Sequence, residues 1–199
     1  MNNDFEIEFD RVNHIYSVDG EVLPSITQLV SSLYGDTYER VNTKLLKRAS
    51  EYGTLVHSEI ERYFKHNDRN YLTLEAKTFI ERVVNEFNIN YVLSEKRVAL
   101  VLNERIVACG TLDLLAYFDN TLYLVDFKTT SVIHLQEVIL QLNLYAKGLL
   151  DTYDIEVNKL AVIQLKNDKY VVKELPKLCN NVIDEKLKIA LAKYESKKD

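Results

Sequence analysis

Cysteine is scarce in this chain: the 199 residues include two, Cys109 and Cys179. The two lie far apart and form no Cys-x-x-Cys pair, so the sequence predicts neither a disulfide framework nor a cysteine-held zinc or iron–sulfur cluster. Any metal ion would therefore be bound by oxygen and nitrogen ligands.

Long apolar runs are also missing, since no stretch of about 18 residues is both apolar and free of charge. The first residues, MNNDFEIEFD, are acidic, whereas a signal peptide is first basic and then apolar. We therefore expect a cytoplasmic protein with no membrane partner. The formal net charge of -5 argues against a broadly basic surface but leaves room for a local basic groove.

Repeats and low-complexity linkers are absent as well, and 47% hydrophobic residues suffice for an ordinary core. We predict one domain over residues 1–199. It divides into an N-terminal hairpin and helical extension (1–50), a core (51–175) and a C-terminal helix (176–199).

The N-terminal third contains strand alternation and then helical periodicity. A turn at Asp19-Gly20 predicts a β-hairpin, and Ser25 is expected to cap the next helix. Helical periodicity follows over 38–64, with an interruption near Tyr52-Gly53. Its expected buried stripe is Leu55, Val56, Ile60 and Phe64.

The remaining two thirds alternate between helical and strand periodicity. We predict a helix over 73–87, a break at 88–91, strands at 96–103, 106–118 and 121–128, a helix over 135–150, a hairpin over 159–175 and a helix over 178–194. This order of elements predicts a mixed α/β sandwich.

Charged residues interrupt two of the apolar strands in GTLDLLAYFDNTLYLVDFKTT (110–130). If Asp119-Asn120 is a two-residue hairpin loop, Asp113 faces Asp126 with Cβ atoms about 4.5–5.5 Å apart. Opposed like charges destabilise a sheet unless a cation such as Mg²⁺ or Mn²⁺ is shared between them. Lys128 lies on the same face as Asp126. The alternative is a structural ion pair of Asp126 and Lys128, with Asp113 solvated.

Two helical pairs complete the candidate residues. His57 and Glu61 lie one turn apart on one helix face, as do Gln141 and Tyr145 on a later helix. Each has a plain structural interpretation: a histidine satisfied in the core, and an ordinary helix surface.

Four segments together resemble the PD-(D/E)XK nuclease superfamily, in its RecB-like exonuclease branch: GTLVHSEIE (53–61), GTLD (110–113), VDFKT (125–129) and QLNLY (141–145). The segment HIYSVDGEVLPSITQLV (14–30) is similar to the opening of phage-type and mitochondrial genome maintenance-type members. The resemblance implies a three-layer α/β/α, restriction-endonuclease-like core with a central mixed sheet, preceded by the N-terminal hairpin and helices.

The resemblance also implies residue roles. Metal would be held by His57, Asp113, Asp126 and the backbone carbonyl of Phe127; catalysis would depend on Asp113, Asp126 and Lys128; and Gln141, Tyr145 and Glu61 would bind DNA or support the site. Glu95 resembles a glutamate often found before the first core strand.

The implied activity is a Mg²⁺- or Mn²⁺-dependent deoxyribonuclease, more an exonuclease than an endonuclease. It would act on DNA independently of sequence, in recombination, repair or phage DNA processing, inside a bacterial or phage-infected cell. The family's four iron–sulfur cysteines are missing, so no such cluster is expected. No helicase motif occurs, so unwinding would need a helicase partner; a single-strand annealing or binding protein is another expected partner.

Two other classes stay open. One is a non-catalytic DNA- or partner-binding module on a nuclease fold, and the other is a structural α/β protein with a fortuitous ion-pair cluster. Six basic residues could line a DNA channel or form solvated helix faces; they are Arg40, Lys44, Lys47, Arg48, Arg62 and Lys147.

Overall fold

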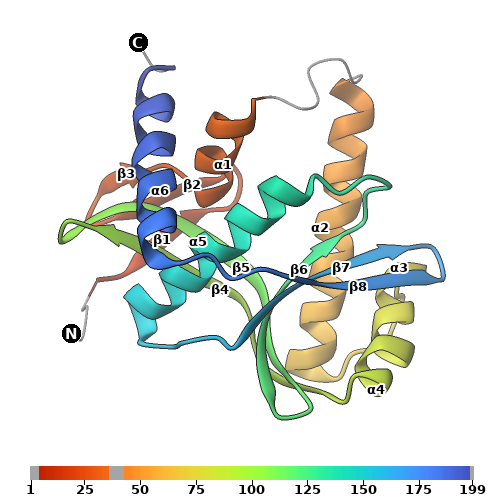
Figure 1. Ribbon diagram of the computed structural model, residues 1–199. Helices are drawn as coiled ribbons and strands as arrows, with labels where there is room; N and C mark the ends of the chain where they lie inside the picture. Colours follow the sequence, from red (N-terminus) through yellow and green to blue (C-terminus); the bar gives the residue numbers. More distant parts are fainter. Residues whose placement is uncertain (1–4, 36–42, 198–199) are drawn as a thin grey trace.

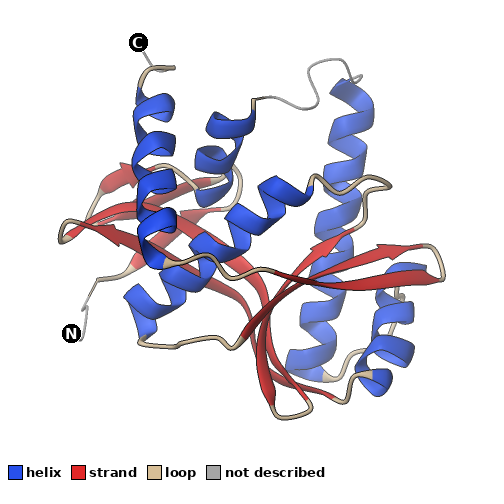
Figure 2. Ribbon diagram, viewed as in Figure 1, coloured by secondary structure: helices blue, strands red, loops and turns tan. Residues whose placement is uncertain are grey.

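Five strands form the central sheet, in the spatial order β4-β5-β6-β7-β8. Their bounds are β4 (Ile89–Leu102), β5 (Arg105–Phe118), β6 (Thr121–Lys128), β7 (Lys159–Lys166) and β8 (Lys169–Leu175). Neighbours are antiparallel except β6 and β7, which are parallel and are connected through α5 (Leu135–Tyr153). The computed structural model describes residues 5–35 and 43–197 (Figure 1). Its mixed sheet and packed helices confirm the predicted α/β class (Figure 2).

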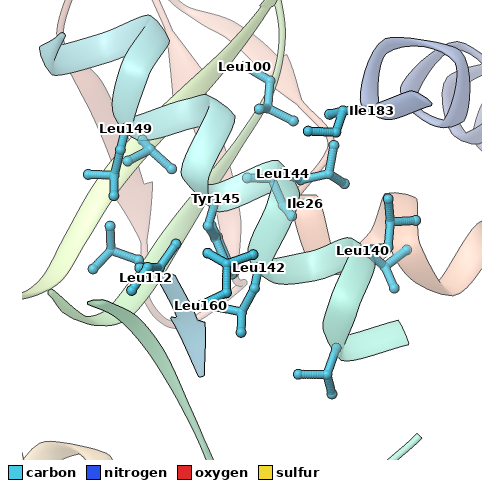
Figure 3. Close-up of a cluster of buried hydrophobic side chains, with 14 of the residues drawn as sticks. Ile26, Leu100, Leu112, Leu140, Leu142, Leu144, Tyr145, Leu149, Leu160 and Ile183 are labelled. Atoms are coloured by element: carbon cyan, nitrogen blue, oxygen red, sulfur yellow. The ribbon is translucent and has the colours of Figure 1, made fainter. Parts of the chain in front are cut away.

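Helices cover both faces of this sheet. One side holds α2 (Thr43–His66), α3 (Leu74–Thr78), the π-helical turn η1 (Phe79–Val83) and α4 (Val84–Glu86), and the other holds α1 (Ile26–Tyr34), α5 and α6 (Asn180–Glu195). Side chains alternate accordingly along β6, where Leu124 packs in the core with α5 and Val125 packs in the core with α2. Figure 3 shows the α5 side, where Leu142, Tyr145 and Leu149 lie close to Leu112 and Leu160.

A smaller antiparallel sheet precedes the helices, in the order β1 (Ile7–Asp10), β2 (Ile15–Val18), β3 (Glu21–Leu23). The predicted hairpin at Asp19-Gly20 is confirmed as the β2–β3 turn, and β1 adds a strand that the sequence did not predict. The Tyr16 hydroxyl lies 2.9 Å from the Thr111 hydroxyl, and the Cys109 N–H donates to the Pro24 carbonyl at 3.1 Å. These bonds fix the small sheet to β5, close to Asp113.

Turn chemistry predicted both later hairpins correctly. Asp119-Asn120 joins β5 and β6, with Phe118 paired to Thr121, and 167–168 join β7 and β8. Ser25 caps α1 as predicted, through a capping box with Gln28. The β5–β6 pairs end at Leu114 and Val125, so the ladder stops one position before Asp113 and Asp126.

The structure differs from the sequence prediction in α2 and at the start of β4. α2 continues through Gly53 without interruption, and residues 38–42 of that predicted helix lie outside the described residues. Leu55 is 46% exposed, because a helix turns by about 100° per residue and Val56 and Ile60 take the buried face. β4 begins at Ile89, inside the predicted break, because that side chain is buried and paired opposite Phe118.

The predicted helix over 73–87 is present and begins at a Thr73 cap, but it includes the π-turn η1. Within residues 5–35 and 43–197, no helix is long and apolar enough to cross a lipid bilayer.

Candidate metal centre

Three separate elements bring three metal-ligating side chains together. His57 comes from the middle of α2, Glu95 from β4 and Asp113 from β5. One ligand atom from each lies within 4.8 Å of the other two, and all three side chains are partly buried. His57 Nδ1 is 3.3 Å from Asp113 Oδ1. An imidazole nitrogen and two carboxylate oxygens at this separation suit a divalent cation.

A β-bulge places Glu95 opposite Asp113. Leu102 pairs with Arg105, and continuing that register would bring Ser94 opposite Asp113. The register shifts by one residue at Leu100 and Val101, after which Ser94 pairs with Leu114 and Glu95 takes the position across from Asp113.

The backbone of Glu95 adopts the left-handed conformation, with φ 48° inside a strand. Such a conformation costs on the order of 1–3 kcal/mol in a residue with a side chain and is concentrated at functional sites. No role for Glu95 was predicted, since neither the bulge nor the backbone conformation is visible in the sequence. The one signal was its resemblance to a glutamate often found before the first core strand of the nuclease family.

Asp113 ties the site to the end of β6. Its Oδ2 accepts a hydrogen bond from the Phe127 N–H at 2.8 Å. The carboxylate therefore takes the place of a β5 backbone partner for Phe127, beyond the point where the β5–β6 pairing ends. Burial disfavours the charged form, but the His57 charge and hydrogen bond, with Lys128 nearby, hold the pKa of Asp113 below its ordinary value. The Phe127 ring packs edge-on against the His57 ring at 5.7 Å. Asp113 is therefore a carboxylate poised to bind a cation.

Asp126 and Lys128 form a buried ion pair beside this group. Asp126 is 3% exposed, and its Oδ1 accepts a hydrogen bond from Lys128 Nζ at 2.9 Å. Oδ2 lies 2.9 Å from the same nitrogen but makes no hydrogen bond within the described residues. Burial raises the pKa of Asp126, with Asp113 adding to the effect and Lys128 opposing it. A buried oxygen without a hydrogen bond is a suitable further donor to a cation.

His57 and Glu95 have strongly shifted pKa values. Burial disfavours the imidazolium, but the carboxylates of Asp113, Asp126 and Glu95 outweigh it and raise the pKa of His57 to about 9. Burial, reinforced by Asp113, raises the pKa of Glu95 to about 7. The cluster thus carries more acid than its cations neutralise, which favours binding of a metal ion.

Tyr145 and Gln141 lie on α5 at the edge of the site. The Tyr145 phenol is 6% exposed, and burial raises its pKa, while the side chains of Gln141 and Thr27 oppose the rise. A Cβ on Gly110 would lie 2.7 Å from Cε1 of Tyr145, so only glycine fits there. The structure therefore joins the predicted segments GTLD and QLNLY by direct packing, with Tyr145 supporting the strand that carries Asp113.

The other predicted residues lie outside the group of three ligands, although the charge of Glu61 helps to raise the pKa of Glu95. Glu61 pairs with Lys65 on α2. Lys147 makes ion pairs with Asp151 and Asp184 at 3.2 and 3.6 Å, so it holds helices together. Lys44, Lys47 and Arg48 are exposed on the first turns of α2, Arg62 is exposed farther along it, and Arg40 lies outside the described residues.

No protein-family model and no curated protein sequence matches this chain. Among solved structures, the chain is similar to one described as "Crystal structure of SSO0001". The two share 16% sequence identity over 88% of this chain and 78% of the other, with a TM-score of 0.49.

Proposed function

We propose that this protein is a Mg²⁺- or Mn²⁺-dependent deoxyribonuclease, acting more as an exonuclease than as an endonuclease. One observation carries the proposal: the His57, Glu95 and Asp113 ligand atoms lie within 4.8 Å of one another, directly beside the Asp126–Lys128 pair. A bound divalent cation can polarise a phosphodiester and activate a water, and a nearby ammonium group can neutralise charge on the phosphate. Helix α2 and strands β4 and β5 would supply the cation site, and β6 supplies the ammonium group of Lys128.

The side chains divide the chemistry between them. His57, Glu95 and Asp113 would hold the ion, with Asp126 as a further donor, and the bound ion would polarise the phosphate and lower the pKa of a water. The ammonium group of Lys128, held by Asp126, would orient the attacking water or neutralise charge on the phosphate. The Asp113 bond to the Phe127 N–H keeps Lys128 in place.

The protein would bind the phosphate backbone of DNA and would not recognise the base sequence. Exposed cations precede His57 on α2, at Lys44, Lys47 and Arg48. Contacts of this kind neutralise phosphates and carry no base information. The preference for exonuclease action follows from the family resemblance of the four sequence segments.

The test is a digestion panel of linear and circular DNA, single- and double-stranded, end-labelled at either terminus, with Mg²⁺, Mn²⁺ or EDTA. We expect metal-dependent loss of linear DNA while closed circles persist. Lys128→Ala should abolish cleavage, whereas Lys173→Ala, which removes the same charge from an exposed position on β8, should not. Unchanged cleavage by Lys128→Ala would refute the assignment.

The alternative is a non-catalytic DNA- or partner-binding module, favoured by one observation: Asp126 pairs with Lys128 and lies outside the group of three ligands. Calorimetry with Mn²⁺ separates the two functions from a purely structural protein. Binding of Mn²⁺ without cleavage of any DNA would select the module, and no binding of Mn²⁺ would select the structural interpretation.

A further inference from the structure

Phe127 joins the metal centre to the hydrophobic core behind it. Its N–H donates to Asp113 Oδ2 at 2.8 Å, and its ring packs edge-on against the His57 ring with 5.7 Å between the ring centroids. The Phe127 side chain is itself buried. One buried residue thus contacts two of the three ligand side chains, so whatever fixes Phe127 also fixes the separation of His57 and Asp113.

The Phe79 ring is a second neighbour of Phe127. The two ring centroids are 4.9 Å apart and the ring planes are inclined at 75°, which is the edge-to-face geometry that aromatic pairs prefer. Phe79 is fully buried. Because such a pair has a preferred angle as well as a preferred distance, Phe79 restricts the tilt of the Phe127 ring as well as its depth in the core.

Four rings form one continuous row that begins and ends on α2. Phe64 packs edge-on against Phe79 at 6.0 Å, so the row runs through His57, Phe127, Phe79 and Phe64. His57 and Phe64 are seven residues apart on α2, so they share one face of the helix and lie about 10 Å apart along its axis. The two rings between them come from β6 and η1. They therefore oppose any sliding of α2 that would carry His57 away from Asp113.

The segment that carries Phe79 is fastened to the β7–β8 turn by hydrogen bonds of its own (Figure 1). Glu75 Oε1 accepts the Asn167 N–H at 2.7 Å, and Arg82 Nη1 donates to the Asp168 carbonyl oxygen at 2.7 Å. Phe79 is also the first residue of the π-turn η1, and such turns are rare and occur frequently at functional sites. The Phe79 ring is therefore held from outside the metal centre.

We propose that Phe79 is a positioning residue of the metal centre: its ring holds Phe127 so that His57 and Asp113 stay at the separation that a divalent cation needs. Phe79 acts through Phe127 and would not itself bind the ion. This inference rests on the metal centre of the proposed function, and it adds a residue that lies outside the four sequence segments of the family resemblance.

Phe118 offers a matched comparison for Phe79. Both belong to the same hydrophobic cluster and both are buried, but the Phe118 ring packs against Phe87 and Tyr123, near the β5–β6 turn. Leucine at either position removes one ring from the same core, so both variants should lose stability. The loss at Phe79 alone should reach the metal ligands.

The experiment measures Mn²⁺ affinity by calorimetry, well below the thermal midpoints of the variants. Phe79→Leu should bind Mn²⁺ about tenfold more weakly than the wild type, as expected when a residue that orients metal ligands is replaced. Phe118→Leu should bind it as tightly as the wild type. Phe79→Tyr keeps the ring and should also bind Mn²⁺ as tightly as the wild type, although its buried hydroxyl lowers the thermal midpoint.

A further variant covers a Phe79→Leu protein that does not fold. Phe64→Leu removes the ring at the partly buried end of the row, where the core tolerates a smaller side chain better, and should weaken Mn²⁺ binding by a smaller factor. If Phe79→Leu does not fold, wild-type affinity of Phe64→Leu overturns the positioning role.

Equal Mn²⁺ affinity of Phe79→Leu and Phe118→Leu would also overturn the positioning role. So would a loss of affinity in Phe79→Tyr as large as that in Phe79→Leu, because lowered stability and not the missing ring would then be the cause. Digestion of linear DNA at saturating Mn²⁺ tests the nuclease function separately. A wild type that binds Mn²⁺ but cleaves no DNA overturns that function alone, and a wild type that binds no Mn²⁺ overturns both.

Discussion

Two clusters of acidic side chains around a lysine can be compared in this molecule. The site cluster consists of His57, Glu95, Asp113, Asp126 and Lys128, and the helix cluster consists of Lys147, Asp151 and Asp184. Both are partly buried and both contain a buried carboxylate oxygen without a hydrogen bond, on Asp126 and on Asp184.

The clusters differ in their pKa shifts and in their backbone. Lys147 lies between two carboxylates, one of which also accepts the Val101 N–H at 2.8 Å, so the helix cluster fastens α5 to α6 and β4. The site cluster has three carboxylates, and Glu95 stands in a strained conformation with a pKa raised to about 7. A lysine among carboxylates is therefore no sign of function by itself, whereas a carboxyl group with a raised pKa on a strained strand is.

The clearest test of different roles for the two clusters is to make the same Asp→Asn substitution in each. Asp126→Asn should lower DNA cleavage about a thousandfold, because the Lys128 ammonium loses its charged partner and the ion a donor. Its free energy of unfolding should be unchanged or higher, since repulsion of Asp113 is removed. Asp151→Asn should keep full cleavage and lose about 1–2 kcal/mol of stability. Rate assays and urea titrations measure both, and equal loss of cleavage in the two variants would contradict the distinction.

Metal binding should distinguish the clusters next. Mn²⁺ at a hundred times its dissociation constant should raise the free energy of unfolding of the wild type by about 2.7 kcal/mol. Asp184→Asn should retain this stabilisation, whereas Asp113→Asn should lose about half of it or more, because its affinity for Mn²⁺ falls at least about tenfold. Thermal melts with Mn²⁺ and with EDTA provide the measurement. If Mn²⁺ stabilised Asp113→Asn as much as the wild type, the assignment of the metal centre would be wrong.

Near each cluster, a glycine is in close contact with a neighbouring side chain. A Cβ on Gly110 would lie 2.7 Å from the Tyr145 ring, and one on Gly148 would lie 2.8 Å from Val98 Cγ2. Either alanine variant should lose about 1–3 kcal/mol of stability from overpacking. Gly110→Ala should in addition slow cleavage, since the displaced strand carries Asp113, and Gly148→Ala should not. Cleavage rates measured well below both melting temperatures test the difference.

A further expected effect is a pH dependence that the site cluster imposes on stability. The folded-state pKa values of His57 and Glu95, about 9 and about 7, exceed their ordinary values of 6.5 and 4.5. The folded protein therefore binds more protons than the unfolded chain between pH 4.5 and 9, so the free energy of unfolding falls as pH rises through this window.

Urea titrations in EDTA at pH 5, 7 and 9 should show this fall, and His57→Gln should flatten it above pH 6.5. Saturating Mn²⁺ should oppose the fall, because the ligands bind the ion deprotonated. Stability that rises from pH 5 to 9 in EDTA would contradict the pKa values of the cluster.

Local rules predicted much of this fold from the sequence. Asp119-Asn120 and the flanking alternation determined the β5–β6 register, and Ser25 marked the start of α1, because turn and cap chemistry depend on adjacent residues. The α2 helix passes through Gly53, since packing of Val56 and Ile60 outweighs the low helix propensity of one glycine.

The resemblance of the four sequence segments, and not a local rule, predicted which side chains of the candidate site lie together. His57, Asp113, Asp126 and Lys128 lie near one another as the resemblance implied. The place of Glu95 depends on a bulge whose extra residue, Val107, lies in β5, and long-range packing determines this bulge while the sequence does not reveal it. The sequence also did not predict that the β5–β6 pairing ends at Leu114 and Val125, because this too depends on long-range packing.

The short turns of the β4–β5–β6 meander also bear on the order of folding. Glu95, Asp113 and Asp126 lie on three consecutive strands joined by two-residue turns, whereas β7 reaches β6 only after the whole of α5. Contacts close in sequence cost little loop-closure entropy, so we expect the meander to form early. The three carboxylates would then meet before α2 brings His57 to them, and the chain must pass through a state of concentrated negative charge.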